Sequence, residues 1–221
     1  MMSNEDLNNN EEINTSGFDA ITETFEKIYP EQKEPLHYRP IICYELGGEY
    51  PLDGISVYRG NGYYHFVTYG FSELYEKESK NKEYSGFGFE LTFKLKMNEK
   101  QINNTKDGDA QDNEIQTAVK FLQQLAKYLF ESGAVFNPYE YIWTKQKEGI
   151  DNEQKSKITG FITIPDEAGE INTPNGKVIF VELLGATDAE LNAIYDKKIT
   201  VKDLAQKIGT DITDYNRESL L

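Results

Sequence analysis

Hydrophobic and polar residues alternate most clearly between Gly86 and Lys96. Every second position there carries a large apolar side chain: Phe87, Phe89, Leu91, Phe93 and Leu95. A period of two predicts a β-strand with one buried face. Gly86 and Gly88 fall on the other face, where they would let a backbone or a side chain approach closely.

Shorter runs rich in apolar, β-branched and aromatic residues predict further strands. These runs lie at residues 41–46, 55–58, 64–69, 158–164 and 178–184. A turn containing Gly60-Asn61-Gly62 separates the second run from the third. The residues at 178–181 are apolar on both faces, which suits a central strand covered by helices.

Two long helices are predicted from apolar residues at helical spacing. The first covers residues 17–28 and ends before Pro30. The second covers residues 114–132, with Asp112 as its N-cap and Gly133 as the residue that ends it.

The C-terminal part of the chain carries two shorter helical patterns. Thr187 and Glu190 have the spacing of a capping box, so a helix begins there, and another covers residues 201–208. Residues 97–113 are polar and predict a loose loop.

Helices before, between and after the strands predict a mixed sheet covered by helices, an α/β fold in the broad sense or α+β. Residues 1–16 are acidic and rich in asparagine, which predicts a disordered tail. The remaining residues, 17–221, are expected to form a single domain.

The composition argues against several classes of function. The 221 residues include 38 Asp and Glu against 23 Lys and Arg, a net charge of −15, which argues against binding of nucleic acid. One cysteine, Cys43, excludes an internal disulfide framework and multi-cysteine metal sites. Neither a long apolar run nor a signal peptide is present, so we expect a cytoplasmic protein without a membrane partner.

Catalytic and cofactor motifs are weak. A serine–histidine pair would need His37 or His65, and the segment around Ser72 lacks the second glycine of a nucleophile elbow. His65, inside a strand, is expected to be packed or at a rim. Residues 107–114 do not keep the calcium-loop order, and no glycine pattern would hold a phosphate. We therefore expect no metal site, no cofactor and no catalysis.

The candidate surface is instead a charged loop between two strands and the tyrosines around it. Tyrosine is favoured at interfaces because it combines apolar area with a polar tip. The residues predicted to contact a protein partner are Tyr64, His65, Glu73, Tyr75, Glu76, Glu78 and Glu83. Lys77, Lys80 and Lys82 are interleaved with the carboxylates, which also fits an ordinary solvated surface.

Several segments resemble the suppressor of fused domain family. They are Pro51-Leu52-Asp53-Gly54-Ile55-Ser56, the stretch from His65 to Tyr75, the glycine signature Ser85 to Phe93, the helix Leu122 to Gly133 and the closing Thr213 to Ser219. The resemblance covers residues 17–221 and is that of a single-domain member of the bacterial type. It implies a mixed, largely antiparallel sheet flanked by helices, without catalytic activity.

The resemblance also implies a partner. Tyr75 matches a tyrosine that family members place near a bound peptide, whereas Lys82 and Glu83 occupy the stretch in which the family carries a further acid. Single-domain members resemble immunity proteins of bacterial toxin systems, and an acidic protein is steered toward a cationic toxin.

Three hypotheses follow. The first is a non-catalytic immunity protein that neutralises a toxin by occlusion. The second is a regulatory adaptor that captures an extended peptide at a sheet edge. The third is a hydrolase that uses the Glu73, Glu78 and His65 region. The partner's identity, the host and the oligomeric state stay open.

Overall fold

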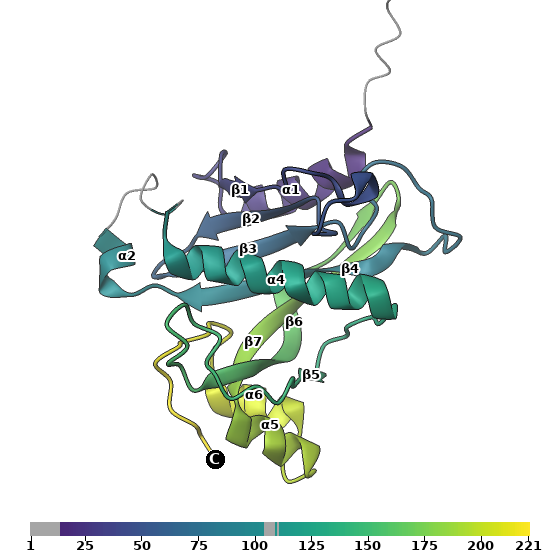
Figure 1. Ribbon diagram of the computed structural model, residues 1–221. Helices are drawn as coiled ribbons and strands as arrows, with labels where there is room; N and C mark the ends of the chain where they lie inside the picture. Colours follow the sequence, from purple (N-terminus) through teal and green to yellow (C-terminus); the bar gives the residue numbers. More distant parts are fainter. Residues whose placement is uncertain (1–13, 104–108, 110) are drawn as a thin grey trace, which may run out of the picture.

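A seven-stranded mixed sheet organises the protein (Figure 1). The computed structural model describes residues 14–103, 109 and 111–221. The strands are β1 (Leu36–Tyr38), β2 (Gly54–Arg59), β3 (Tyr63–Tyr69), β4 (Tyr84–Lys96), β5 (Tyr141–Ile142), β6 (Ile158–Thr173) and β7 (Gly176–Thr187). They are ordered β1-β2-β3-β4-β7-β6-β5. Among the strands that the structure describes, only β4 and β7 pair in parallel, so the predicted mixed, largely antiparallel sheet is confirmed.

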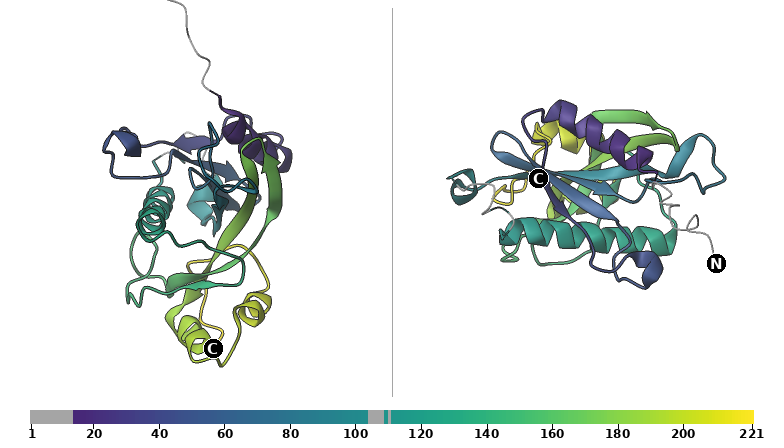
Figure 2. Two further views of the ribbon diagram at one scale, coloured as in Figure 1. Left: turned by 90° about the vertical axis from the view of Figure 1, so that its right-hand side faces the viewer. Right: turned by 90° about the horizontal axis from the view of Figure 1, so that it is seen from above.

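Helices cover both faces of this sheet. They are α1 (Ser16–Ile28), α2 (Glu99–Asn103), α4 (Asn113–Ser132), α5 (Asp188–Tyr195) and α6 (Val201–Ile208). Seen from above, the sheet lies between α1 and α4 (Figure 2). None of the helices described combines the length and the apolar composition needed to cross a membrane.

Each helical layer has its own apolar core. Ile115, Leu122 and Leu129 of α4 pack with the apolar side chains of β4. Ile21 and Phe25 of α1 pack on the opposite face, and α5 and α6 cover the far end of the β6–β7 hairpin. The helix over 114–132 is confirmed with its Asp112 cap and with Gly133 in the left-handed conformation at φ 68°. The capping box at Thr187 is also confirmed.

The strand β4 corrects the expectation of a single buried face. Its alternate side chains Glu90, Thr92 and Lys94 are no more than 2% exposed, as buried as the apolar residues between them. The reason is that α1 and the long β6–β7 hairpin cover the second face. A period of two identifies a strand, but it does not show whether polar residues on the other face meet water.

Three further segments differ from the expectations. Residues 41–46 form no strand: the 3-10 turn η1 (Tyr44–Leu46) lies there, and Ile41 is fully exposed. The strand β1 lies earlier, between Pro35 and Pro40, in a segment too short to give a pattern. Within the expected loop 97–113, residues 99–103 are helical, while residues 104–108 and 110 lie outside the described part of the chain, as do 1–13 of the expected tail.

Buried charges on β4 are neutralised by carboxylates from later parts of the chain. The Lys94 ammonium lies 2.6 Å from Asp211, 2.9 Å from Glu167 and 3.6 Å from the buried Glu182. Burial opposes the charge on Lys94, but these carboxylates raise the pKa of Lys94 above its usual value. Lys94 therefore ties β4 to the C-terminal half of the chain.

We expect Lys94→Met to lower the free energy of unfolding by about 3 kcal/mol, because it leaves the carboxylate cluster without its cation. The matched control is Lys96→Met on the same strand. Lys96 pairs with Asp214 at 2.7 Å but is 57% exposed, so its loss is expected to cost about 1 kcal/mol or less. Urea unfolding of the two variants measures the difference, and equal losses would contradict this role for Lys94.

Candidate functional site

The candidate site is the β3–β4 loop, residues 70–83, which projects from one side of the sheet (Figure 1). Its base is buried: Phe71 and Leu74 are at most 3% exposed. Beneath it, the Glu90 carboxylate accepts hydrogen bonds from the backbone N–H groups of Gly70 (3.0 Å) and Ser72 (2.9 Å). The loop therefore starts from a fixed position.

Glu90 is itself fully buried. The hydroxyl groups of Ser72 and Thr68 donate to its carboxylate at 2.6 and 2.7 Å. Burial raises the pKa of Glu90 to about 7, although these hydrogen bonds oppose the shift. The group under the loop thus changes charge near neutral pH.

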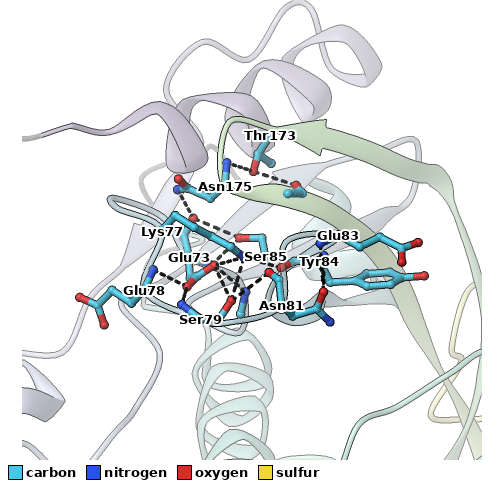
Figure 3. A network of polar contacts seen from close by, with 12 residues as sticks. Glu73, Lys77, Glu78, Ser79, Asn81, Glu83, Tyr84, Ser85, Thr173 and Asn175 are labelled. Carbon is cyan, nitrogen blue, oxygen red and sulfur yellow. Dashed lines mark hydrogen bonds and ion pairs between the residues drawn. The ribbon is translucent and has the colours of Figure 1, made fainter.

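The Glu73 carboxylate organises the middle of the loop (Figure 3). It accepts hydrogen bonds from the backbone N–H groups of Glu78 (2.7 Å), Ser79 and Gly86 (2.9 Å), and it pairs with the Lys77 ammonium at 2.8 Å. Burial alone would raise the pKa of Glu73, but Lys77 and the backbone donors outweigh it and hold the pKa at about 2. Glu73 is therefore ionised and fully occupied inside the loop.

Two other elements fix the loop from outside. The Asn175 side chain, at the tip of the β6–β7 hairpin, donates to the backbone carbonyls of Glu73 (2.8 Å) and Tyr75 (3.2 Å). The Leu74 carbonyl accepts from the N–H groups of Gly17 and Phe18 at the start of α1. Segments about 100 residues apart in sequence thus set the shape of one loop.

The outer surface of the loop carries the remaining predicted residues. Tyr75 is 42% exposed, and Glu76, Glu78 and Glu83 are exposed as well. Figure 3 shows the carboxylates of Glu78 and Glu83 pointing away from the Glu73 network. Within the described part of the chain, no ion pair is formed by the carboxylate of Glu76, Glu78 or Glu83. Lys80 and Lys82 of the same loop are exposed as well, so the surface has mixed charge and an exposed tyrosine.

Tyr64 and His65 lie elsewhere, and their burial corrects their assignment to the partner surface. Both are at most 1% exposed on β3. The Tyr64 hydroxyl donates to Asp109 at 2.7 Å, and His65 lies between the Tyr29 hydroxyl (2.9 Å) and Asp166 (3.1 Å). His65 is thus the packed histidine that its place in a strand suggested.

The residues of the hydrolase hypothesis do not form a common site. Glu73 is held ionised in the loop, the Glu78 carboxylate points away from it, and His65 is buried with Asp166. A general acid near neutral pH needs a raised pKa, whereas that of Glu73 is lowered. Among the residues that the structure describes, no group of three His, Cys, Asp or Glu side chains could hold a metal ion.

Sequence reasoning missed Asn175, Ser85 and Asp109. Asn175 belongs to a Pro-Asn-Gly sequence, which predicts a turn. The sequence does not predict its contact with a loop 100 residues away. The Ser85 hydroxyl accepts from the Glu73 N–H at 2.8 Å. Asp109 stood out only as part of a weak calcium-like segment, and it instead pairs with Arg59 at 2.6 Å.

Comparison with known proteins gives consistent matches. The sequence profile of a family described as "Suppressor of fused protein (SUFU)" matches residues 48–218. Suppressor of fused homologs from Mus musculus and Homo sapiens are each 30% identical over 192 residues, or 80% of this chain. The chain spans about 37% of the length of these curated relatives.

Two solved structures share the fold at 26% sequence identity and a TM-score of 0.80, and each match covers 93% of this chain. One is described as "the Sufu-Fu complex crystal structure", and 92% of that chain is covered. The other is the crystal structure of Drosophila Suppressor of Fused, of which 51% is covered.

We expect Glu73→Gln to lower the free energy of unfolding by about 1–3 kcal/mol, because a neutral amide cannot accept all the donors around it. Amide hydrogen exchange of residues 76–84 is expected to become faster. Glu76→Gln is the control, since Glu76 is exposed and forms no ion pair among the described residues. Unchanged exchange in Glu73→Gln would show that the loop is held by other contacts.

The Glu90 carboxyl makes the free energy of unfolding depend on pH. Its pKa is about 7 in the folded protein against an ordinary value of 4.5, so the folded state holds the extra proton between these values. This contribution to stability is full below about pH 4.5 and is lost as pH rises through 7. We expect Glu90→Gln to gain stability relative to the wild type between pH 5 and pH 8, by roughly 1–3 kcal/mol. If the curves of unfolding free energy against pH ran parallel for the wild type and Glu90→Gln, this role of Glu90 would be refuted.

Proposed function

The chain belongs to the suppressor of fused family, and from this premise we propose that it is a non-catalytic protein-binding domain. Its partner surface is the outer side of the β3–β4 loop, centred on Tyr75. The observation that carries the proposal is the combination of an exposed tyrosine with a backbone fixed from several sides. A surface that is already ordered loses little conformational entropy when it binds.

Tyr75 suits the centre of such a surface. A tyrosine ring contributes apolar contact area and a hydroxyl at its tip, and it has few rotatable bonds to fix. Glu76, Glu78 and Glu83 are exposed in the same loop, and no ion pair within the described residues neutralises their carboxylates. A partner with lysine or arginine near an apolar side chain would complement this arrangement.

Protein binding by a related chain supports this assignment. One of the two similar solved structures is that of a complex between Sufu and Fu. That complex was observed for the related protein and not for this chain. The match covers 92% of the related chain, so a domain of this fold occurs with a protein partner.

The finer proposal is an immunity protein that neutralises a toxin by occlusion in the cytoplasm. Support comes from the net charge of −15, because a strongly acidic protein is steered toward a cationic cleft. The mixed charge of the loop itself indicates that Tyr75, and not local charge alone, provides the specific contact.

A regulatory adaptor that captures an extended peptide is the second candidate. The sheet ends in two short strands, β1 and β5, so its edges lie within reach of an added strand. The two candidates differ in the partner: a folded cationic protein for the first and a linear segment for the second.

We expect Tyr75→Ala to weaken capture of the protein partner by about tenfold or more, since exposed tyrosines that a partner covers are common hot spots. The experiment is a pull-down from lysate, with the bound chains identified and their affinity then measured. Tyr128→Ala is the matched control, because Tyr128 is a 57% exposed tyrosine that belongs to α4 and not to the loop.

The salt dependence of the same affinity separates the two candidates. A cationic toxin is expected to bind more weakly as ionic strength rises, and Glu78→Lys with Glu83→Lys should slow its association. Equal capture by the wild type and Tyr75→Ala would remove the loop as the binding site.

A further inference from the structure

A pocket of about 350 Å³ lies at the end of the molecule that holds α2 and the start of α4 (Figure 1). Four parts of the chain form its walls: the end of β4 with the residues up to α2, the first turn of α4, the loop between β5 and β6, and the C-terminal segment. A pocket of this size can hold a small organic molecule. It shares no residue with the β3–β4 loop.

The charged side chains that line this pocket are four carboxylates and two ammonium groups: Glu114, Asp151, Glu153, Asp214, Lys96 and Lys155. Each ammonium group already pairs with a carboxylate, Lys96 with Asp214 at 2.7 Å and Lys155 with Glu153 at 2.5 Å. In the described part of the chain, Glu114 and Asp151 form no ion pair. The lining therefore has two carboxylates without a cation.

Two arginines adjoin lining residues, and both are engaged elsewhere. The Arg59 guanidinium donates to the backbone carbonyl of Gln101 and pairs with Asp109 at 2.6 Å. Arg217, directly after Asn216, pairs with Glu190 at 2.6 Å. Neither arginine supplies the missing counter-ion.

Glu114 and Asp151 lie side by side. The Glu114 carboxylate accepts the backbone N–H of Asn152 at 3.0 Å, and Asp151 accepts those of Lys155 (3.1 Å) and Ser156 (2.6 Å). These donors are neutral, so they do not cancel the negative charge. Burial, and after it the charge of Asp151, raises the pKa of Glu114 above its usual value. A cation in the pocket would relieve this repulsion.

The Tyr215 hydroxyl lies at the same place. It is buried and, among the described residues, has no hydrogen-bond partner. Burial raises the pKa of Tyr215, and the charges of Glu114 and Asp151 raise it further, so the hydroxyl is close to both carboxylates. Ser156 connects the groups, because its hydroxyl donates to the Tyr215 backbone carbonyl at 2.8 Å and its N–H donates to Asp151. A buried hydroxyl without a partner is costly, which points to a ligand that brings a donor.

We propose that this pocket binds a primary alkylammonium group. The ammonium has one positive charge and three N–H donors, and the pocket offers three acceptors: the carboxylates of Glu114 and Asp151 and the Tyr215 hydroxyl. Its alkyl chain lies against the buried side chains of Leu95 and Met97, which are 1% and 5% exposed. A planar guanidinium suits one carboxylate in a bidentate pair, whereas these acceptors come from three separate segments.

The probe is pentylamine, titrated into isotope-labelled protein and followed by the NMR signals of the backbone amides. A salt concentration of about 0.15 M screens general charge attraction. We expect saturable shifts of the amides of Asn152, Lys155 and Ser156, whose N–H groups donate to the two carboxylates. Pentanol, which has the same chain without the charge, is expected to produce no saturable shift at these amides.

The variant Glu114→Gln removes a charge but keeps an acceptor for the Asn152 N–H, and it is expected to weaken pentylamine binding about fivefold or more. Glu131→Gln, in the exposed last turn of the same helix, is the matched control and should leave the affinity unchanged. Tyr215→Phe is expected to weaken binding about threefold. It should also raise the melting temperature of the free protein, because it removes a buried hydroxyl without a partner.

Two further probes distinguish the source of the ammonium group. A lysine with both backbone ends blocked presents it as the side chain of a protein partner would, and a diaminopentane presents it as a free amine. Tighter binding of the blocked lysine identifies a partner's side chain, and tighter binding of the diamine identifies a small metabolite.

Equal affinity of the wild type, Glu114→Gln and Tyr215→Phe for pentylamine would overturn the proposal. So would shifts that arise at exposed carboxylates of other segments, such as the β3–β4 loop, while the amides of Asn152, Lys155 and Ser156 stay unmoved. Because Tyr75 is not part of the pocket, Tyr75→Ala is expected to leave these titrations unchanged.

Discussion

The structure depends on polar groups that are buried along the central strand β4 and are all given partners. Glu90 and Lys94 occupy positions that a one-sided strand would leave to solvent, and both are nearly fully buried. A buried charge is tolerated only where hydrogen bonds or opposite charges replace water. Glu90 meets this condition through the start of the β3–β4 loop, and Lys94 meets it through β6, β7 and the C-terminal segment. One strand therefore fixes both the β3–β4 loop and the far half of the chain.

A second carboxylate, Glu73, stabilises the β3–β4 loop further from the sheet. Glu73 does for the middle of the loop what Glu90 does for its base: a carboxylate collects backbone N–H groups that would otherwise need water. As a result, the loop keeps a defined shape although much of its surface is charged. The exposed glutamates and Tyr75 are therefore carried by a loop whose backbone is fixed.

Much of the fold could be predicted because the periodicity of β4, α1 and α4 identifies each element and its apolar face, and because the capping residues Asp112 and Thr187 mark where helices begin. The strand β1 could not be predicted, since three residues between prolines are too few to show a hydrophobic period. The site was predictable only in part. The chain neighbours of Tyr75 indicated an exposed loop, but Tyr64 and His65 share the same aromatic pattern and are buried, because burial depends on layers from distant segments. The contact of Asn175 with the loop is likewise a product of the tertiary fold.

The parallel pairing of β4 with β7 has a consequence for synthesis on the ribosome. The sheet grows in sequence order from β1 to β4, but the next strand beside β4 comes only after α4, β5 and β6, at residues 176–187. Until then, one edge of β4, with its row of large apolar side chains, has no neighbour, and such edges invite association with other chains. The nascent polypeptide is thus exposed to aggregation at this edge until residues 176–187 have left the ribosomal exit tunnel and β7 has paired with β4.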